Sequence, residues 1–292
     1  MADAQIGGSG ERPAEVSASP ADETISAGAP AEVGVRFEVD GEIATVTLCR
    51  PERRNAQTPA MWSALARFGE HLPEQVRIVV VRGEGPSFSA GLDLSLLTGA
   101  PGQRSFSEIA ALDDAALDRL IAEFQRGFLW LRRPEIVSIA AVQGHAIGAG
   151  FQLALACDLR IAAEDAKFCM KEPALGLVPD LTGTKPLVEL VGLPRAIEMC
   201  LTARTVDAAE AERYGLAERV VPAGDLDRAV NELVTSLLAI DRHAAAATKR
   251  LLLGARHRTL EEQAAAERSE QMVRLRTLFA SLAPQGSVGA GN

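Results

Sequence analysis

Two short turns built from small residues decide the fold of this chain: Phe88-Ser89-Ala90-Gly91-Leu92-Asp93 and Gly144-His145-Ala146-Ile147-Gly148-Ala149-Gly150. Each turn follows an apolar run and stands where a strand is expected to pass into a helix. A corner of this kind directs unpaired backbone N–H groups outward from a helix N-terminus. Two such corners that meet at one point would form an oxyanion hole, and the protein would then be an enzyme that acts on a carbonyl group.

The segments around the turns alternate between strand and helix patterns. The β-branched run 77–82 and the apolar run 136–142 each lead into one turn, and both are apolar enough to be central parallel strands. Thr58, followed by a proline, is typical of a helix N-cap and predicts a helix over 58–72. A long amphipathic helix is expected over 108–132. Strand and helix patterns that repeat with short links predict an α/β fold with a parallel sheet.

Composition divides the chain into four parts. Residues 1–32 are rich in Ala, Gly, Ser, Pro and Glu and are predicted to be a disordered tail, because such a segment buries too little apolar surface to offset the entropy of ordering. Residues 33–222 are predicted to form the α/β core and residues 223–283 a C-terminal helical region. Residues 284–292 are expected to be a second disordered tail. The helical region has more apolar surface than one sheet can bury, which predicts contacts between subunits.

Charge and composition exclude several classes of protein. A formal net charge of −9 argues against sequence-independent nucleic-acid binding, which needs a basic face. No apolar run approaches the length of a membrane span and no signal peptide is recognisable, so a cytoplasmic protein without a membrane partner is expected. The four histidines form no ligand-spaced pair, and no metal site is predicted. The four cysteines form no CxxC pair and are expected to be free thiols.

Two other chemistries fit the turns less well. The second turn reads Gly144-x-x-x-Gly148-x-Gly150, which differs from the GxGxxG fingerprint of dinucleotide-binding folds. Ser89 does not have glycines at both flanking positions of a nucleophile elbow, and a hydrolase that used Ser89 with His145 would still need an acid to orient the histidine. The favoured interpretation is polarisation of a carbonyl by backbone amides.

Several motifs occur in an order that resembles the crotonase (enoyl-CoA hydratase/isomerase) superfamily. Residues 87–94, Ser-Phe-Ser-Ala-Gly-Leu-Asp-Leu, are similar to its F-x-A-G-x-D-L signature, and residues 141–150 are similar to its second signature. Further matches are Cys157 to Ala162, Phe168 with Glu172, Leu175 to Pro179 and Ala209 to Pro222. The resemblance covers roughly residues 33 to 255. It implies a crotonase-like spiral of repeated ββα units, with a helical C-terminal region that forms homotrimers or hexamers.

The resemblance also implies a substrate, a coenzyme A thioester of an unsaturated fatty acid, with no cofactor apart from the coenzyme A of the substrate itself. Its carbonyl oxygen would lie between the backbone amides of Ala90 and Ala149, and losing one such donor typically costs about 2.7–4 kcal/mol. Arg53 and Arg54 would contact the coenzyme A, although both equally fit solvated loop charges. The full set implied for coenzyme A contacts is Arg53, Arg54, Ala56, Ala90, Leu92, Asp93 and Leu94.

The acidic residues bear on which reaction of the family the chain performs. Hydratases of the family hold water between two glutamates; at these positions this chain has Gln152 and Glu172. An amide cannot accept a proton as a carboxylate does, so the two-glutamate mechanism is in doubt. Asp180 stands where the dienoyl-CoA isomerase branch has an aspartate that works with the glutamate. Gln152 departs from that branch as well, because an acid is expected there.

The sequence therefore leaves three interpretations open. The first is an enzyme that shifts or hydrates a double bond with Glu172, together with Asp180, while Gln152 lines the site; isomerisation is favoured over hydration. The second is a non-catalytic acyl-CoA-binding protein that lacks the first glutamate. The third is the hydrolase that uses Ser89 and His145. Asp180 also fits a turn or a helix N-cap, and Glu172 fits a solvated carboxylate.

Overall fold

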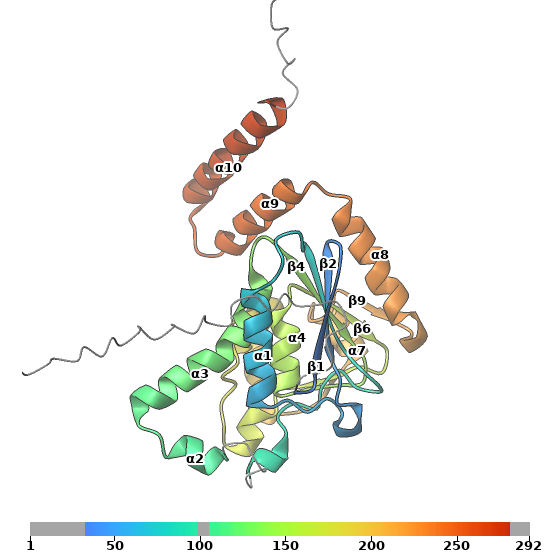
Figure 1. Ribbon diagram of the computed structural model, residues 1–292, viewed down its shortest axis with the longest axis vertical. Helices are drawn as coiled ribbons and strands as arrows, with labels where there is room; N and C mark the ends of the chain where they lie inside the picture. Colours follow the sequence, from blue (N-terminus) through green and yellow to red (C-terminus); the bar gives the residue numbers. More distant parts are fainter. Residues whose placement is uncertain (1–32, 98–104, 281–292) are drawn as a thin grey trace, which may run out of the picture.

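The computed structural model describes residues 33–97 and 105–280 (Figure 1). The tails predicted for residues 1–32 and 284–292 lie outside these residues. The last strand ends at Val221, and the described chain beyond it is helical apart from connecting turns. No helix within the described ranges is both long and apolar enough to cross a membrane.

A six-stranded sheet forms the centre of the molecule, in the order β1-β2-β3-β4-β6-β9. β1 and β2 form an antiparallel hairpin, and all other neighbouring strands are parallel. β3 and β4 are almost entirely buried, as their apolar runs predict. The strands are β1 (Val35–Asp40), β2 (Ile43–Leu48), β3 (Ile78–Gly83), β4 (Val137–Val142), β6 (Leu159–Ala163) and β9 (Arg219–Val221).

A second, three-stranded sheet holds the short strands β5 (His145–Ile147), β7 (Lys167–Cys169) and β8 (Val206–Asp207). β4 is followed at once by β5, and β6 by β7, so one strand of each pair enters the large sheet and the next enters the small one. The helix α4 (Ala149–Ala156) follows β5. This arrangement confirms the predicted α/β class and its ββα repeat.

Helices cover both faces of the large sheet (Figure 1). Val79 and Val81 of β3 belong to the same buried core as α1 (Pro59–Glu70) and α3 (Asp114–Leu129). The alternate residues of this strand face α8 (Leu226–Leu238), as expected from the two-residue period of a strand. The Thr58 side chain accepts a hydrogen bond from the amide of Met61, which confirms Thr58 as the N-cap of α1.

The helix predicted over 108–132 is interrupted. The structure has a short helix, α2 (Phe106–Ala110), and then α3, which ends in a 3-10 turn, η3 (Trp130–Arg132). The Asp113 side chain accepts a hydrogen bond from the amide of Ala116 and begins α3 as its N-cap. The prediction of one continuous helix was wrong because the apolar periodicity continues across this start signal.

The remaining helices lie in the C-terminal half of the chain. They are α5 (Thr184–Val191), α6 (Leu193–Thr202), α7 (Ala208–Arg213), α9 (Arg242–Ala255) and α10 (Leu260–Ala280), with the 3-10 turns η1 (Pro51–Arg53), η2 (Leu94–Leu97), η4 (Glu172–Leu175) and η5 (Ala223–Asp225). α9 and α10 form an arm that extends from the core, and α10 lies against α9 (Figure 1). No residue of α10 is buried, so its apolar side chains face solvent in this single chain.

Lys249 connects α9 to the core. Its Nζ donates to Asp158 Oδ2 at 2.6 Å and to the carbonyl oxygens of Ile136 at 2.7 Å and Arg133 at 2.8 Å. The side chains of Lys249 and Asp158 are only 11% and 16% exposed, so this ion pair is screened little by solvent. Burial of the ammonium group is therefore balanced by three hydrogen bonds at the base of the arm.

We expect Lys249→Met to lower the free energy of unfolding by about 3 kcal/mol, because it leaves the buried Asp158 carboxylate without its cation. Urea denaturation followed by circular dichroism measures this difference. Arg228→Met is the control, since Arg228 pairs with Asp225 and Glu232 on the exposed surface and its loss should change the free energy of unfolding much less. Equal losses of unfolding free energy in the two variants would contradict the stabilising role of the buried Lys249–Asp158 pair.

Candidate active site

The two small-residue turns lie side by side. Ser89 and Ala146 form a parallel bridge, in which the amide of Ser89 donates to the carbonyl of His145 at 2.7 Å and the amide of Ile147 donates to the carbonyl of Ser89 at 3.0 Å. The two turns therefore meet through backbone hydrogen bonds.

Glycine makes this close approach sterically allowed. Gly91 has φ +87°, and a Cβ atom on it would overlap the carbonyl oxygen of Ile147 and lie 3.5 Å from the amide nitrogen of Ala149. A Cβ atom on Gly150 would lie 2.6 Å from the carbonyl oxygen of Ser89. Any larger residue at Gly91 or Gly150 would force the turns apart.

The amide of Ala90, one of the two expected oxyanion donors, is already used within the fold. It donates to the carbonyl oxygen of Arg54 at 2.8 Å. The next amide, that of Gly91, donates to Ser89 Oγ at 3.2 Å. The expectation for Ala90 therefore needs correction, because its hydrogen faces the loop before α1 and is not free to meet a ligand.

The backbone amides of Leu92 and Ala149, unlike that of Ala90, donate no hydrogen bond within the described residues. The amide of Asp93 donates to the carbonyl of Gln57, and the parallel bridge between Gln57 and Leu92 directs the amide of Leu92 to the opposite side. Ala149 is the first residue of α4, and its N-cap, Gly148, supplies no side-chain acceptor. Within the described part of the chain, no hydrogen bond is donated by the amide of Leu92 or Ala149.

Glu172 lies beside the N-terminus of α4. A Cβ atom on Gly148 would be 3.1 Å from Glu172 Oε1, which also accepts a hydrogen bond of 2.7 Å from Gln152 Nε2. Glu172 Oε2 is buried and has no hydrogen-bond partner among the described residues. Burial raises the pKa of Glu172, backbone and Gln152 hydrogen bonds lower it, and the charge of Asp180 raises it, with a net upward shift. A buried carboxylate with one unpartnered oxygen is suited to proton transfer.

Asp180 is half-buried on the segment that follows η4. Burial raises the pKa of its carboxyl, and a hydrogen bond from its own amide opposes this shift in part. Its carbonyl oxygen accepts a hydrogen bond of 2.7 Å from Gln125 Nε2 on α3. The N-cap of α5 is Gly183. Asp180 is therefore not the N-cap of that helix, and its charge lies close enough to Glu172 to influence its pKa.

The residues expected to contact coenzyme A are divided by the structure. Asp93 is buried and forms an ion pair of 2.8 Å with Arg50. Burial opposes ionisation of Asp93, but hydrogen bonds from Ser95 and Arg50 outweigh it and lower its pKa. Its carboxylate is thus engaged in holding the first turn, not available to a ligand.

The other members of this set differ in exposure. Ala56 is buried, and its carbonyl oxygen accepts a hydrogen bond from Arg50 Nη1. Arg53, Arg54 and Leu94 are exposed. Of the charged residues expected to contact coenzyme A, only Arg53 and Arg54 therefore present an exposed side chain.

The pair required by a Ser89 hydrolase does not form. Ser89 Oγ donates to the carbonyl of Asn55 at 2.8 Å and is buried. The Nδ1 atom of His145 lies 3.1 Å from Ser87 Oγ instead. The structure therefore gives no support to the hydrolase interpretation.

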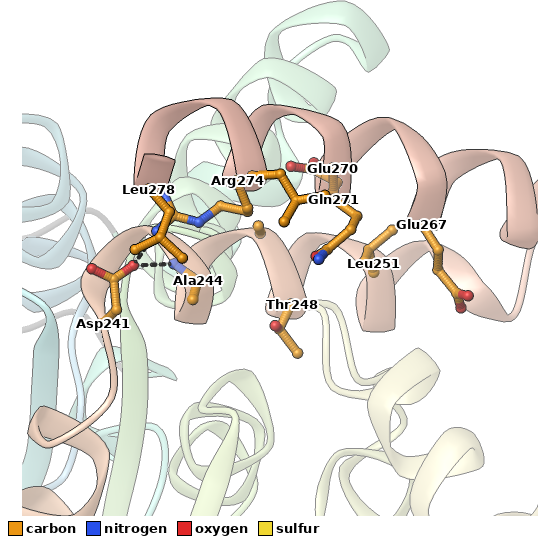
Figure 2. Close-up of a pocket in the computed structure, with 11 residues that line it drawn as sticks. Asp241, Ala244, Thr248, Leu251, Glu267, Glu270, Gln271, Arg274 and Leu278 are labelled. Atoms are coloured by element: carbon orange, nitrogen blue, oxygen red, sulfur yellow. Dashed lines mark hydrogen bonds and ion pairs between the residues drawn. The ribbon is translucent and has the colours of Figure 1, made fainter. Parts of the chain in front are cut away.

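A separate groove of about 620 Å³ lies between α9 and α10 (Figure 2). Arg274 of α10 reaches Asp241 at the start of α9, with a salt bridge of 2.6 Å. The groove is lined by no residue of the two turns and contains neither Glu172 nor Asp180. It belongs to the arm and not to the candidate active site.

Across residues 33–97 and 105–280, no group of three His, Cys, Asp or Glu side chains is placed to hold a metal ion.

A spiral of ββα units whose two turns present amides beside a buried carboxylate defines a crotonase-type fold. The family model for enoyl-CoA hydratase/isomerase matches residues 38–277, and the chain belongs to this family. A crystal structure of a candidate enoyl-CoA hydratase from Thermobifida fusca, in complex with acetoacetyl-CoA, has 60% identity and a TM-score of 0.81; the match covers 84% of this chain and 95% of that chain.

Curated relatives include two kinds of enzyme. A probable enoyl-CoA hydratase of Mycobacterium bovis is 34% identical over 230 residues, which are 78% of this chain and 84% of the relative. A peroxisomal Δ(3,5)-Δ(2,4)-dienoyl-CoA isomerase of Arabidopsis thaliana is 29% identical over 231 residues, which are 78% of this chain and 83% of the relative. The family therefore supports an enzyme of the hydratase or isomerase type.

We expect Gly91→Ala to destabilise the protein by clearly more than the cost of its backbone conformation alone. A non-glycine residue at positive φ costs about 1–3 kcal/mol, and here the new Cβ atom would also overlap the Ile147 carbonyl. Gly41→Ala is the matched control, because Gly41 also has positive φ, at +55°, but nothing lies within 4 Å of its added Cβ. Chemical denaturation measures both variants, and equal losses would show that the turns can separate without cost.

Proposed function

We propose that this protein is an isomerase that shifts a double bond in an unsaturated acyl-CoA thioester by transferring a proton between two carboxyl groups. The observation that carries this proposal is the environment of Glu172. Its neighbour on α4 is the amide of Gln152, which donates a hydrogen bond and cannot exchange a proton, whereas its charged neighbour is Asp180. The acid and base of the site are then Glu172 and Asp180.

The thioester oxygen is proposed to lie between the amides of Leu92 and Ala149. These amides belong to the two turns that the Ser89–Ala146 bridge holds together, and neither donates a hydrogen bond elsewhere in the described chain. Negative charge that develops on the oxygen would meet two fixed N–H dipoles, one of them at the N-terminus of α4. Donors of this kind stabilise a transition state by several kcal/mol.

The proposed reaction begins with an ionised Glu172 and a protonated Asp180. Glu172 removes a proton from the carbon next to the thioester carbonyl, and the electrons of the broken C–H bond form an enolate whose charge lies on the thioester oxygen. The conjugated system then takes a proton from Asp180 at its far end as the carbonyl re-forms. The double bonds have moved, Glu172 holds the abstracted proton and Asp180 is ionised. Proton exchange with solvent restores the starting state.

Hydration of an enoyl-CoA is the second candidate. It is supported by the similarity to the Mycobacterium bovis relative, which is named as a probable enoyl-CoA hydratase. In this case Glu172 would activate the water without a second glutamate on α4. The acyl-CoA substrate class is supported for both reactions by the acetoacetyl-CoA complex of the Thermobifida fusca neighbour. Arg53 and Arg54 are proposed to contact the coenzyme A phosphates.

A homotrimer or hexamer is proposed for the assembled enzyme. The support is the arm formed by α9 and α10, because α10 has no buried residue and carries exposed apolar side chains that a neighbouring subunit would cover. The exposed apolar residues of α10 include Leu260, Met272, Val273, Leu275 and Phe279.

We expect the purified protein to convert a 3,5-dienoyl-CoA into the conjugated 2,4-dienoyl-CoA, which is followed by ultraviolet absorbance. Parallel assays with 2-enoyl-CoA and 3-enoyl-CoA test hydration and the shift of a single double bond. Conversion of 2-enoyl-CoA to a hydroxyacyl-CoA, without any isomerisation, would favour the second candidate. Binding of these thioesters without any turnover would identify a non-catalytic acyl-CoA-binding protein.

We expect Glu172→Gln to lower kcat by about 10²–10⁴-fold, the usual contribution of a positioned acid or base. Asp180→Asn should lower kcat for the dienoyl substrate while substrate binding is retained. Glu189→Gln is the control, because Glu189 pairs with Lys185 on α5, away from the turns. An unchanged rate in Glu172→Gln would remove Glu172 from its proposed role.

We expect kcat/KM to fall as the pH is lowered through the raised pKa of Glu172, because the base is then protonated. Since the folded-state pKa is raised, this loss begins at a higher pH than for an ordinary glutamate. A pH profile of kcat/KM measures it. A profile that stays flat down to the ordinary range of glutamate titration would contradict the assignment.

A further inference from the structure

We propose that Gln152 is a positioning residue that fixes Glu172 in one orientation and ties it to the backbone beside Asp180. This inference rests on the proposed function, in which Glu172 and Asp180 exchange protons with the substrate. Gln152 is fully buried in the first turns of α4. Its side chain donates a hydrogen bond to Glu172 and accepts one from the backbone amide of Leu181, the residue after Asp180.

The surroundings of Gln152 allow only one orientation of its amide. Gln152 Oε1 accepts hydrogen bonds from the amides of Leu181 at 2.8 Å and Gly183 at 3.3 Å. A backbone N–H can only donate, so the oxygen of the side-chain amide must face these two groups. The Nε2 atom is therefore left to face Glu172, and it donates to Oε1 at 2.7 Å.

Tight packing holds this side chain in place. A Cβ atom on Gly183 would lie 2.7 Å from Cγ of Gln152, so glycine allows the segment after Asp180 to close over the glutamine. On the other side, Gln125 of α3 donates to the carbonyl oxygen of Asp180 at 2.7 Å. The backbone around Asp180 is thus held by two glutamines from two helices, of which only Gln152 also touches Glu172.

The bond from Gln152 determines which oxygen of Glu172 can react. Oε1 is held by Nε2, whereas Oε2 has no partner among the described residues and is free to exchange a proton. The hydrogen bond from Gln152 stabilises the ionised form of Glu172 and so lowers its pKa. Burial and the charge of Asp180 act in the opposite direction and raise it. Cys169 and Cys200 are the further titratable groups whose pKa values respond to Glu172.

An acid at position 152 would change this arrangement in a defined way. The carboxylate of a Gln152→Glu variant can still accept from the amides of Leu181 and Gly183, but its second oxygen would replace Nε2, which is 2.7 Å from Glu172 Oε1. Two carboxylates at such a distance cannot both ionise easily and share one proton. The wild-type amide therefore keeps a second carboxylate away from Glu172 Oε1.

A carboxyl titration tests this inference without relying on turnover. Full-length protein carrying ¹³C-carboxyl-labelled glutamate is titrated by NMR, and the Glu172 signal is identified as the one absent from Glu172→Gln. We expect Gln152→Glu to raise the pKa of Glu172 by about 1–3 pH units through the like-charge interaction. Gln152→Met removes the donated bond and should raise it by a smaller amount. Glu189→Gln is the control: Glu189 pairs with Lys185 and is not among the groups that shift the pKa of Glu172, which should stay unchanged.

The same variants are then compared by kinetics with the dienoyl-CoA. Gln152→Glu keeps the bonds to Leu181 and Gly183. In this variant the acidic limb of the kcat/KM profile should move to higher pH, together with the pKa of Glu172 measured by NMR. We also expect kcat to fall while KM changes little. The inference would be overturned if Glu172 had the same pKa in Gln152→Glu and in Gln152→Met as in the wild-type protein. If no substrate is converted by the wild-type protein, the proposed function fails, while the NMR titration still decides the role of Gln152.

Discussion

The structure of the site depends on one backbone contact, the bridge between Ser89 and Ala146. It joins a turn after β3 to a turn after β4, which are neighbouring parallel strands of the large sheet. Parallel pairing brings the carboxyl ends of both strands to the same edge, and the glycines at 91 and 150 remove the Cβ atoms that would keep the turns apart. The amides of Leu92 and Ala149 each lie three residues beyond this bridge, on turns that are held together by backbone pairing and not by flexible side chains.

The electrostatics of the site follow from the same packing. α4 is buried along its whole length, so a polar side chain on it must find partners inside the protein. Gln152 satisfies this requirement with two backbone donors and one carboxylate acceptor. A charged residue there would have brought a second carboxylate against Glu172 in a place of low dielectric constant. The neutral amide therefore adds no further negative charge beside Glu172.

Much of the fold could be predicted from local patterns. The N-cap Thr58 with its proline located α1, and the runs of β-branched residues located β3 and β4, because these signals lie in adjacent residues. The helix over 108–132 was predicted as continuous, since periodicity alone does not show that the Asp113 side chain bonds to the amide of Ala116. β8 has only two residues, and its pairing with β7 is a contact between segments distant in sequence.

The sequence by itself determined the fold class and the family, and it supplied the groups of the proposed site: two small-residue turns, Glu172, Asp180 and an amide at 152. These follow from residue types and spacings, which are properties of the chain. Only the tertiary structure decided which amides are free, because Ala90 donates to Arg54 across a loop and Leu92 does not. It also decided that Asp93 holds Arg50 and that Gln152 donates to Glu172. Hydrogen-bond direction depends on partners brought together from distant segments, and no local pattern records it.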